Sequence, residues 1–228
     1  MKILNLYACL GGNRYKWDEV AEDAGIEIEI TAVELDEELA KLYQERFPND
    51  NVIVADAHQY LLDHYKEIDF IWSSPPCPTH SRMNYTFKNR DTFKIKYPDM
   101  KLYQEIIFLD NFFKGKYIVE NVIPYYEPLI PYKKRDRHLY WTNFNLPNIL
   151  SKRMPPKMNC NKNITKKMSQ QFMDFHCINS LINKYKGKQD KGKIARNLVD
   201  YEAGKTIFET FLGIETKQNI NQKTIFDI

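Results

Sequence analysis

The sequence predicts an α/β protein, with a Rossmann-like, doubly wound and mostly parallel sheet followed by a small basic lobe. Short apolar segments alternate with helix-like segments along the first part of the chain, a rhythm typical of parallel sheets covered by helices. Residues able to carry chemistry follow these apolar segments repeatedly, where the carboxyl ends of parallel strands would meet. The alternation stops near residue 146, where a Lys- and Asn-rich region begins.

Length and composition limit the class of protein. The 228 residues can bury one sizeable core and a small appended lobe. No apolar run could span a bilayer, and the first residues lead directly into a strand-like segment without a secretory signal. The four cysteines are scattered, which is typical of reduced thiols, so we expect a cytoplasmic protein. Without paired C-x-x-C spacing, we expect no metal site.

Charge is distributed unevenly along the chain. Residues 133–200 contain 16 Lys/Arg against 4 Asp/Glu, whereas the remainder contains 17 against 26, for an overall net charge of +3. An acidic body beside a basic segment fits a catalytic domain next to a polyanion-binding surface. A solvated, lysine-rich face explains the charge equally well.

A glycine turn follows the first predicted strand. Residues 2–9, KILNLYAC, form that strand, and Leu10-Gly11-Gly12 leads into a helix over residues 15–24. Glycines at such a turn let backbone N–H groups approach a ligand, although the two glycines are equally consistent with a plain tight turn. The dinucleotide fingerprint G-x-G-x-x-G is absent.

Acidic residues end the next two predicted strands. The strand over residues 28–34 ends at Glu34, and Asp36 is the expected N-cap of a helix that runs to Phe47. An acidic residue at this position commonly binds a ribose diol, and the alternative is a solvated carboxylate. The strand over 52–55 ends at Asp56, before a short helix over 57–65.

The fourth predicted strand, residues 68–72, leads to a candidate nucleophile. Pro75, Pro76 and Pro78 surround Cys77 and hold its thiol just beyond the strand end. A cysteine thiolate is a strong nucleophile, although many free cysteines are simply small buried apolar residues. The polar, basic stretch over 78–98 has the length of a lid or binding loop, and an amphipathic helix is expected over 99–113.

The fifth predicted strand, residues 117–122, brings Glu120 and Asn121 to the same edge of the sheet. A glutamate in such a strand is costly to bury unless it is paired or functional. Residues 133–144 then predict a strand on which Arg135 and Arg137 share one side, an arrangement that suits bidentate anion or carboxylate contacts. A solvated cationic edge is the alternative. The last regular segment is a helix-like stretch over 194–213.

These motifs in this order resemble the C5-cytosine DNA methyltransferase family, and especially its small, phage-type members. The segments that carry the resemblance are LYACLGG, VELD, VIVADAH, SPPCPTHS, Glu120-Asn121-Val122 and Arg135-Asp136-Arg137. The resemblance implies transfer of a methyl group from S-adenosylmethionine to C5 of a cytosine flipped out of double-stranded DNA. It also implies a monomer in a bacterial or phage-infected cell, with a possible restriction–modification context.

The resemblance assigns a role to each candidate residue. Cys77 would attack C6, Glu120 beside Asn121 would contact N3, Arg135 and Arg137 would orient Glu120 and the base, and Ser81 would lie near the phosphate. The cofactor-binding residues would be Tyr7, Ala8, Cys9, Leu10, Gly11, Gly12, Glu34 for the ribose, Asp56 for the adenine, Pro75 and Asn197. Cys9 and Arg196 occupy positions where the family commonly has glycine.

The resemblance further implies four parts. These are a catalytic and cofactor-binding domain (1–145), a small target-recognition lobe (146–192), a C-terminal helix returning to the catalytic domain (193–213) and a tail (214–228). Two alternatives stay open, a tRNA-methylating member of the same family and a non-catalytic DNA-binding relative.

Overall fold

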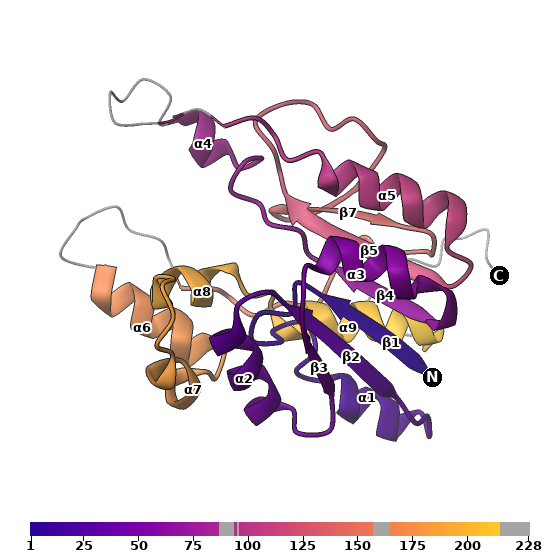
Figure 1. The fold of residues 1–228 in the computed structure, drawn as a ribbon, viewed down its shortest axis with the longest axis horizontal. Coiled ribbons are helices and arrows are strands. Elements are labelled where there is room, and N and C mark those ends of the chain that lie inside the picture. Colours follow the sequence, from indigo (N-terminus) through magenta and orange to yellow (C-terminus); the bar gives the residue numbers. More distant parts are fainter. Residues whose placement is uncertain (87–93, 95, 157–164, 215–228) are drawn as a thin grey trace.

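The computed structural model describes residues 1–86, 94, 96–156 and 165–214, which form an α/β body with a helical lobe at one end (Figure 1). Within these residues the sheet has seven strands, in the spatial order β3-β2-β1-β4-β5-β7-β6. The strands are β1 (Lys2–Leu6), β2 (Glu29–Glu34), β3 (Asn51–Val54), β4 (Phe70–Ser73), β5 (Lys116–Val122), β6 (Lys133–Arg135) and β7 (His138–Thr142).

Helices separate the first five strands, as the alternation in the sequence predicts. The helices are α1 (Trp17–Asp23), α2 (Glu37–Arg46), α3 (Ala57–His64), α4 (Arg82–Thr86), α5 (Lys101–Phe112), α6 (Thr165–Phe175), α7 (Asn179–Lys184), α8 (Lys191–Asn197) and α9 (Tyr201–Leu212), and a 3-10 turn (Tyr65–Glu67) follows α3. Asp36 and Asp56 cap α2 and α3 by accepting hydrogen bonds from backbone N–H groups of the first turn. The predicted N-cap at Asp36 is therefore confirmed.

The sheet is doubly wound and mostly parallel, which confirms the predicted fold class. Strands β1 to β5 are parallel, whereas β7 is antiparallel to β5 and β6 is antiparallel to β7. From β1 the chain passes outward to β2 and β3, and it then returns to β4 on the other side of β1. The winding direction therefore reverses between β1 and β4, and ligands of open α/β sheets bind beyond the carboxyl ends of the strands at such a reversal.

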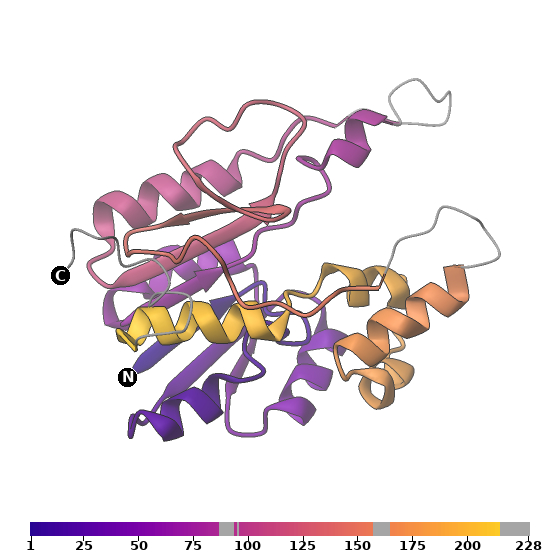
Figure 2. The same cartoon turned by 180° about the vertical axis from the view of Figure 1, so that it is seen from behind.

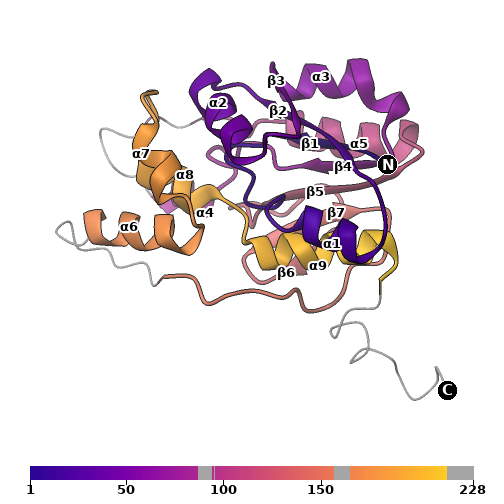
Figure 3. The same cartoon turned by 90° about the horizontal axis from the view of Figure 1, so that it is seen from below.

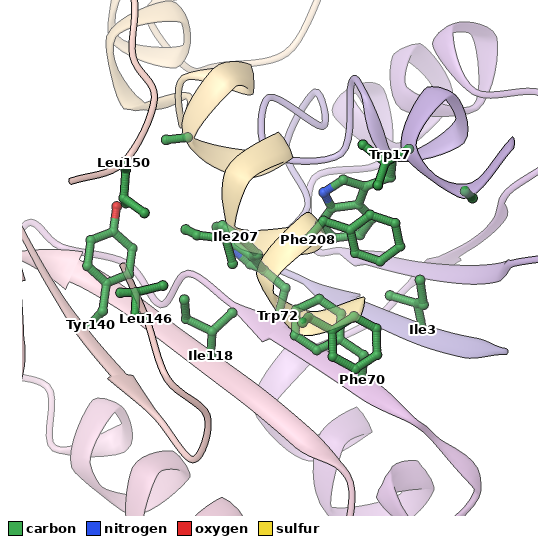
Figure 4. Close-up of a cluster of buried hydrophobic side chains, with 14 of the residues drawn as sticks. Ile3, Trp17, Phe70, Trp72, Ile118, Tyr140, Leu146, Leu150, Ile207 and Phe208 are labelled. Carbon is green, nitrogen blue, oxygen red and sulfur yellow. The ribbon is translucent and has the colours of Figure 1, made fainter. Parts of the chain in front are cut away.

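Both faces of the sheet are buried. On one face, α1 and α9 pack over the parallel strands, and Figure 2 shows α9 lying across the sheet. Figure 4 shows Trp17 and Phe208 meeting above Phe70 and Trp72 of β4; the rings of Trp17 and Phe208 stack with centroids 5.1 Å apart. Helices α3 and α5 cover the opposite face, as Figure 3 shows from below. This two-sided burial explains why the strands are continuously apolar.

The helices α6, α7 and α8 form the lobe, which lies beyond the carboxyl ends of the parallel strands (Figure 1). Its apolar side chains pack against the turn after β1 and against α2. Polar contacts add to this interface, because Tyr185 donates a hydrogen bond to Asp36 at 2.7 Å and Arg46 donates to the carbonyl oxygens of Leu10 and His176. The lobe is thereby fixed against the edge of the sheet that carries the candidate residues.

Two predicted elements are wrong. The strand predicted over 133–144 is a hairpin, in which Arg135 pairs with His138 and a two-residue turn places Asp136 at a φ of 51°. The helix-like stretch predicted over 194–213 is interrupted after Asn197. The break packs the backbone of Val199 against Gly12, where a Cβ at Gly12 would lie 2.5 Å from the Val199 carbonyl oxygen.

Some predicted features fall outside the described residues, namely Cys160, residues 215–228 of the tail and most of the second half of the 78–98 loop. Among the described residues, α4 occupies part of that loop. None of the helices described is long and apolar enough to cross a membrane.

Candidate active site

A cavity of about 1080 Å³ runs along the carboxyl ends of the parallel strands and is closed on one side by the lobe. It is larger than a typical pocket for one small ligand, so it has room for a cofactor together with a base. Most of the predicted site residues line it, namely Tyr7, Ala8, Cys9, Gly12, Glu34, Asp56, Pro75, Cys77, Glu120, Asn121, Arg135, Arg137 and Asn197. Leu10, Gly11 and Ser81 do not line the cavity.

Cys77 lies in the loop after β4, and that loop is held from both sides. The side-chain amide of Asn121 donates to the carbonyl oxygen of Pro75 at 2.9 Å, and the N–H groups of His80 and Ser81 donate to the carbonyl oxygen of Cys77. The thiol is half-buried and free. Burial raises its pKa and the negative charge of Glu120 raises it further, whereas a hydrogen bond with the backbone of Cys77 and, after it, the ammonium group of Lys193 act in the opposite direction.

Glu120 is buried in β5, and its carboxylate has partners on both oxygens. Ser74 donates a hydrogen bond to Oε2 at 3.0 Å, and Ser74 is itself held by the indole N–H of Trp72 at 2.9 Å. Nε2 of His138 lies 3.5 Å from Oε1. The carboxylate is thereby presented at the same cavity as the Cys77 thiol.

The two arginines do not act as a same-face pair, because Arg135 ends β6 whereas Arg137 lies in the hairpin turn itself. The guanidinium group of Arg135 donates to the carbonyl oxygens of Leu146 and Pro147 and to the side chain of Asn148. Arg135 therefore holds the segment that leads toward the lobe, and its hydrogen bonds do not orient Glu120. Arg137 lies at the exposed turn and lines the cavity.

At one position in the turn after β1, both the backbone conformation and the lack of space for a Cβ atom require glycine. Gly11 has a φ of 64°, and a Cβ there would lie 2.4 Å from the ring of Phe47. Tyr7 and Cys9 also adopt left-handed φ values, of 57° and 49°. Such values persist only where the surrounding structure holds them, and here the N–H of Cys9 donates to Glu34 at 2.8 Å.

Three side chains beyond β2 and β3 fit the parts of a nucleoside. Glu34 is half-buried. Burial raises the pKa of its carboxyl group, whereas the hydrogen bonds from the backbone N–H groups of Asp36 and Cys9 lower it. Leu35 is 68% exposed at the cavity, which gives a planar ring an apolar surface. Asp56 has a lowered pKa, chiefly because the N–H of Gln59 donates to it and also because Lys101 lies 3.4 Å from Oδ2, so it presents an anion at the cavity. These residues suit a ribose and an adenine.

Sequence reasoning missed several residues at the cavity. They are Leu35, Ser74, His138 and Lys193. Leu35 and Ser74 lie inside the segments VELD and SPPCPTHS, but the resemblance assigns them no role, and His138 directly follows Arg135-Asp136-Arg137. Period-two alternation could not reveal that the chain turns between Arg135 and His138. Lys193 carried no local signal, since its place depends on how the lobe packs. Among the described residues no cluster of His, Cys, Asp or Glu could hold a metal ion.

Residues 1–123 match the family model of the C-5 cytosine-specific DNA methylases. This span is more than half of the 228 residues and includes the turn after β1, the cysteine loop and Glu120. The chain belongs to this family. The predicted resemblance is thereby confirmed, and membership in the DNA methylase family implies use of S-adenosylmethionine. The hairpin and the lobe lie outside the matched residues.

Solved structures also resemble this chain. EhMeth, a methyltransferase of Entamoeba histolytica, is 10% identical and covers 93% of this chain and 98% of its own, with a TM-score of 0.50. A mutant of Spodoptera frugiperda DNMT2 is 27% identical over 53% of this chain and 35% of that chain (TM-score 0.36). A putative DNA modification methyltransferase of an Escherichia coli prophage is 20% identical over 56% and 34% (TM-score 0.36).

The match to EhMeth extends over nearly all of both chains and shows the fold of S-adenosylmethionine-dependent methyltransferases. This chain spans about a third of the length of the DNMT2 and prophage chains. No curated protein matches it.

Proposed function

We propose that this protein is a DNA (cytosine-5)-methyltransferase that works through a covalent adduct between Cys77 and the target cytosine. The observation that carries the proposal is the shared cavity. It brings Cys77 and Glu120 to the same space as Glu34, Asp56 and the turn after β1. Methyl transfer requires this arrangement, because the cysteine nucleophile, the target cytosine and the methyl donor must meet in one cavity.

Cys77 and Glu120 would together activate C5 of the cytosine for methyl transfer. C5 of cytosine is a poor nucleophile, and addition of the Cys77 thiolate to C6 makes it electron-rich. Glu120, oriented by Ser74 and His138, would donate a hydrogen bond or proton at N3 and so stabilise the charge that develops on the ring. Once C5 has accepted the methyl group, loss of the C5 proton to solvent, elimination of Cys77 and return of any N3 proton to Glu120 would release 5-methylcytosine.

The residues around the turn after β1 would hold S-adenosylmethionine, which supplies an electrophilic methyl group when bound. Glu34 would accept hydrogen bonds from the ribose hydroxyls, Leu35 would contact the adenine face and Asp56 would accept from the adenine amino group. Asn197, at the end of α8, would close the cavity near the turn. All four line the cavity.

DNA fits the charge and accessibility of the site. C6 of cytosine cannot be reached inside a base stack, so the cytosine must leave the duplex before Cys77 can attack it. The excess of Lys and Arg in residues 133–200 offers phosphate contacts beside the cavity. These contacts would hold the duplex while the cytosine occupies the pocket.

The test is transfer of tritiated methyl groups to duplex DNA and, in parallel, to total tRNA. We expect incorporation into DNA at C5, and loss of all incorporation in Cys77→Ala with affinity for S-adenosylhomocysteine unchanged by calorimetry. Cys177→Ser is the matched control, because Cys177 is exposed and lies outside the cavity. Full activity of Cys77→Ala would refute the mechanism, and incorporation into tRNA alone would refute the substrate.

A further inference from the structure

A buried carboxylate of α5 joins three segments of the chain beneath the winding reversal. Glu105 has 0% relative exposure. Its Oε1 accepts a hydrogen bond from the hydroxyl of Tyr7 at 2.5 Å and lies 3.0 Å from Nδ1 of His58, and its Oε2 accepts from the hydroxyl of Ser73 at 2.7 Å. Each carboxylate oxygen therefore has a partner, as a buried charge requires.

The three partners of Glu105 belong to the segments that bound the cavity. Tyr7 opens the turn after β1, Ser73 ends β4 just before the cysteine loop, and His58 follows Asp56 by two residues. Leu6 and Ser73 are register partners in the β1–β4 pair. Glu105 thus lies under the junction at which the cofactor side and the nucleophile side of the cavity meet.

Packing alone would favour an apolar residue at this position. The same helix buries Leu102, Ile106 and Leu109, and an apolar residue in place of Glu105 would pack without the desolvation cost of a carboxylate. Tyr7 also has a left-handed backbone, which needs support. Burial raises the pKa of Tyr7, and the Glu105 charge raises it further, so the phenol stays protonated and donates to the carboxylate.

We propose that Glu105 is a positioning residue that holds the turn of residues 7–12 and the cysteine loop of residues 74–78 in one fixed relation. Its bond to Tyr7 sets the backbone of the turn. Its bond to Ser73 sets the start of the loop, where Ser74 contacts Glu120. The inference rests on the proposed function, since it concerns the two groups that methyl transfer must bring together.

Two conservative variants test the inference. Tyr7→Phe removes one hydrogen bond to the carboxylate, and Glu105→Gln removes its charge while keeping its shape. Tyr117→Phe is the matched control. Tyr117 donates a hydrogen bond at 3.1 Å to Asp110, which lies on α5 as Glu105 does, and neither Tyr117 nor Asp110 lines the cavity. The measurements are the Kd of S-adenosylhomocysteine by calorimetry, the thermal midpoint, and the single-turnover rate at saturating S-adenosylmethionine.

We expect Tyr7→Phe and Glu105→Gln to raise the Kd about tenfold, the size of one lost hydrogen bond to a charged group. Glu105→Gln should also lower the single-turnover rate, because the cysteine loop loses its anchor. Tyr117→Phe should leave the Kd and the rate unchanged, whatever its effect on the midpoint. Should Glu105→Gln fail to fold, Ser73→Ala tests the same anchor through a slower single turnover at unchanged Kd.

Failure of this inference and failure of the proposed function would give different results. If the wild type binds cofactor but Tyr7→Phe and Glu105→Gln match its Kd and its rate, Glu105 only stabilises the fold and the inference is overturned. If the wild type binds no S-adenosylhomocysteine, the proposed function is overturned, and the inference with it.

Discussion

The thiol of Cys77 lies under the influence of two opposite charges, the carboxylate of Glu120 and the ammonium group of Lys193. Burial and Glu120 disfavour the thiolate, whereas Lys193 favours it. Because the thiolate is the nucleophile, Lys193 increases the fraction of reactive protein at neutral pH. Lys193 comes from the lobe, so one part of the nucleophile's environment lies outside the segment that resembles other family members.

The first prediction concerns Lys193. In Lys193→Met the pKa of Cys77 should rise further above that of an ordinary thiol, so alkylation by iodoacetamide should slow at neutral pH and recover only at higher pH. The rate at Cys77 is followed by mass spectrometry across a pH series. Lys188→Met removes the same charge from the lobe outside the cavity and should leave the profile unchanged. Identical profiles for the wild type and both variants would contradict the prediction.

The second prediction concerns Gly11. Alanine there meets both a left-handed φ and the Phe47 ring, so Gly11→Ala should destabilise the protein by about 2–4 kcal/mol from strain and overpacking. Gly25→Ala has a similar φ of 65° with no atom within 4 Å of the added Cβ, and strain alone should cost about 1–2 kcal/mol. Urea unfolding measures both. Equal losses would show that the Phe47 contact is relieved by movement.

At the scale of elements, the ends of helices are fixed by single side chains. Asp200 is the N-cap of α9, accepting a hydrogen bond from the N–H of Glu202 at 3.2 Å, and it also accepts from the backbone and side chain of Arg153. Arg153 in turn stacks over the rings of Phe175 and Tyr201. One carboxylate therefore starts α9 and ties the chain before the lobe to it.

The third prediction follows from this double role. Asp200→Ala loses the cap and leaves Arg153 without its carboxylate partner, so it should destabilise the protein by about 2–4 kcal/mol. Asp190→Ala, at the N-cap of α8, loses a cap on an exposed aspartate and should cost about 1 kcal/mol. Thermal and urea unfolding provide the comparison. A loss at Asp200 no larger than that at Asp190 would mean that the contacts with Arg153 contribute little.

The regular elements of the sheet could be predicted from the sequence because their signals are local. Apolar strands, the cap at Asp36 and the prolines around Cys77 each carry their own pattern. The hairpin could not be predicted, since residues 133–144 keep a strand-like composition through the turn and the left-handed Asp136 gives no glycine signal. The break between α8 and α9 depends on a tertiary contact of Val199 with Gly12, which no local pattern reports.

At the scale of the whole molecule, the cavity has two walls of different origin. The strand ends supply one wall, and the lobe and hairpin supply the other, which lies beyond the residues that match the family model. The candidate chemistry could therefore be assigned from sequence motifs, whereas of the second wall only Arg135, Arg137 and Asn197 could be predicted. Its residues include Arg153, Lys193 and Arg196, consistent with the basic character of this part of the chain.

The fourth prediction concerns this basic surface. Lys167 and Lys186 are exposed on the lobe, and if they contact phosphates, Lys167→Gln and Lys186→Gln should each weaken binding to duplex DNA. Each change should reduce the slope of log K against log salt by about one. Lys114→Gln, on the exposed end of the body after α5, should change neither quantity. Fluorescence anisotropy across a salt series measures the slopes, and equal slopes for all four proteins would show that the duplex lies elsewhere.

The two margins of the sheet differ in how they meet another molecule. Strand β6 is only three residues long and consists of Lys133, Lys134 and Arg135, so an identical margin approaching it would meet like charge. Strand β3, at the opposite margin, carries Val54 at 51% exposure and lacks this cationic barrier. Fibrillar self-association by strand addition would therefore begin at β3, and a lysine at position 54 is the substitution that should suppress it.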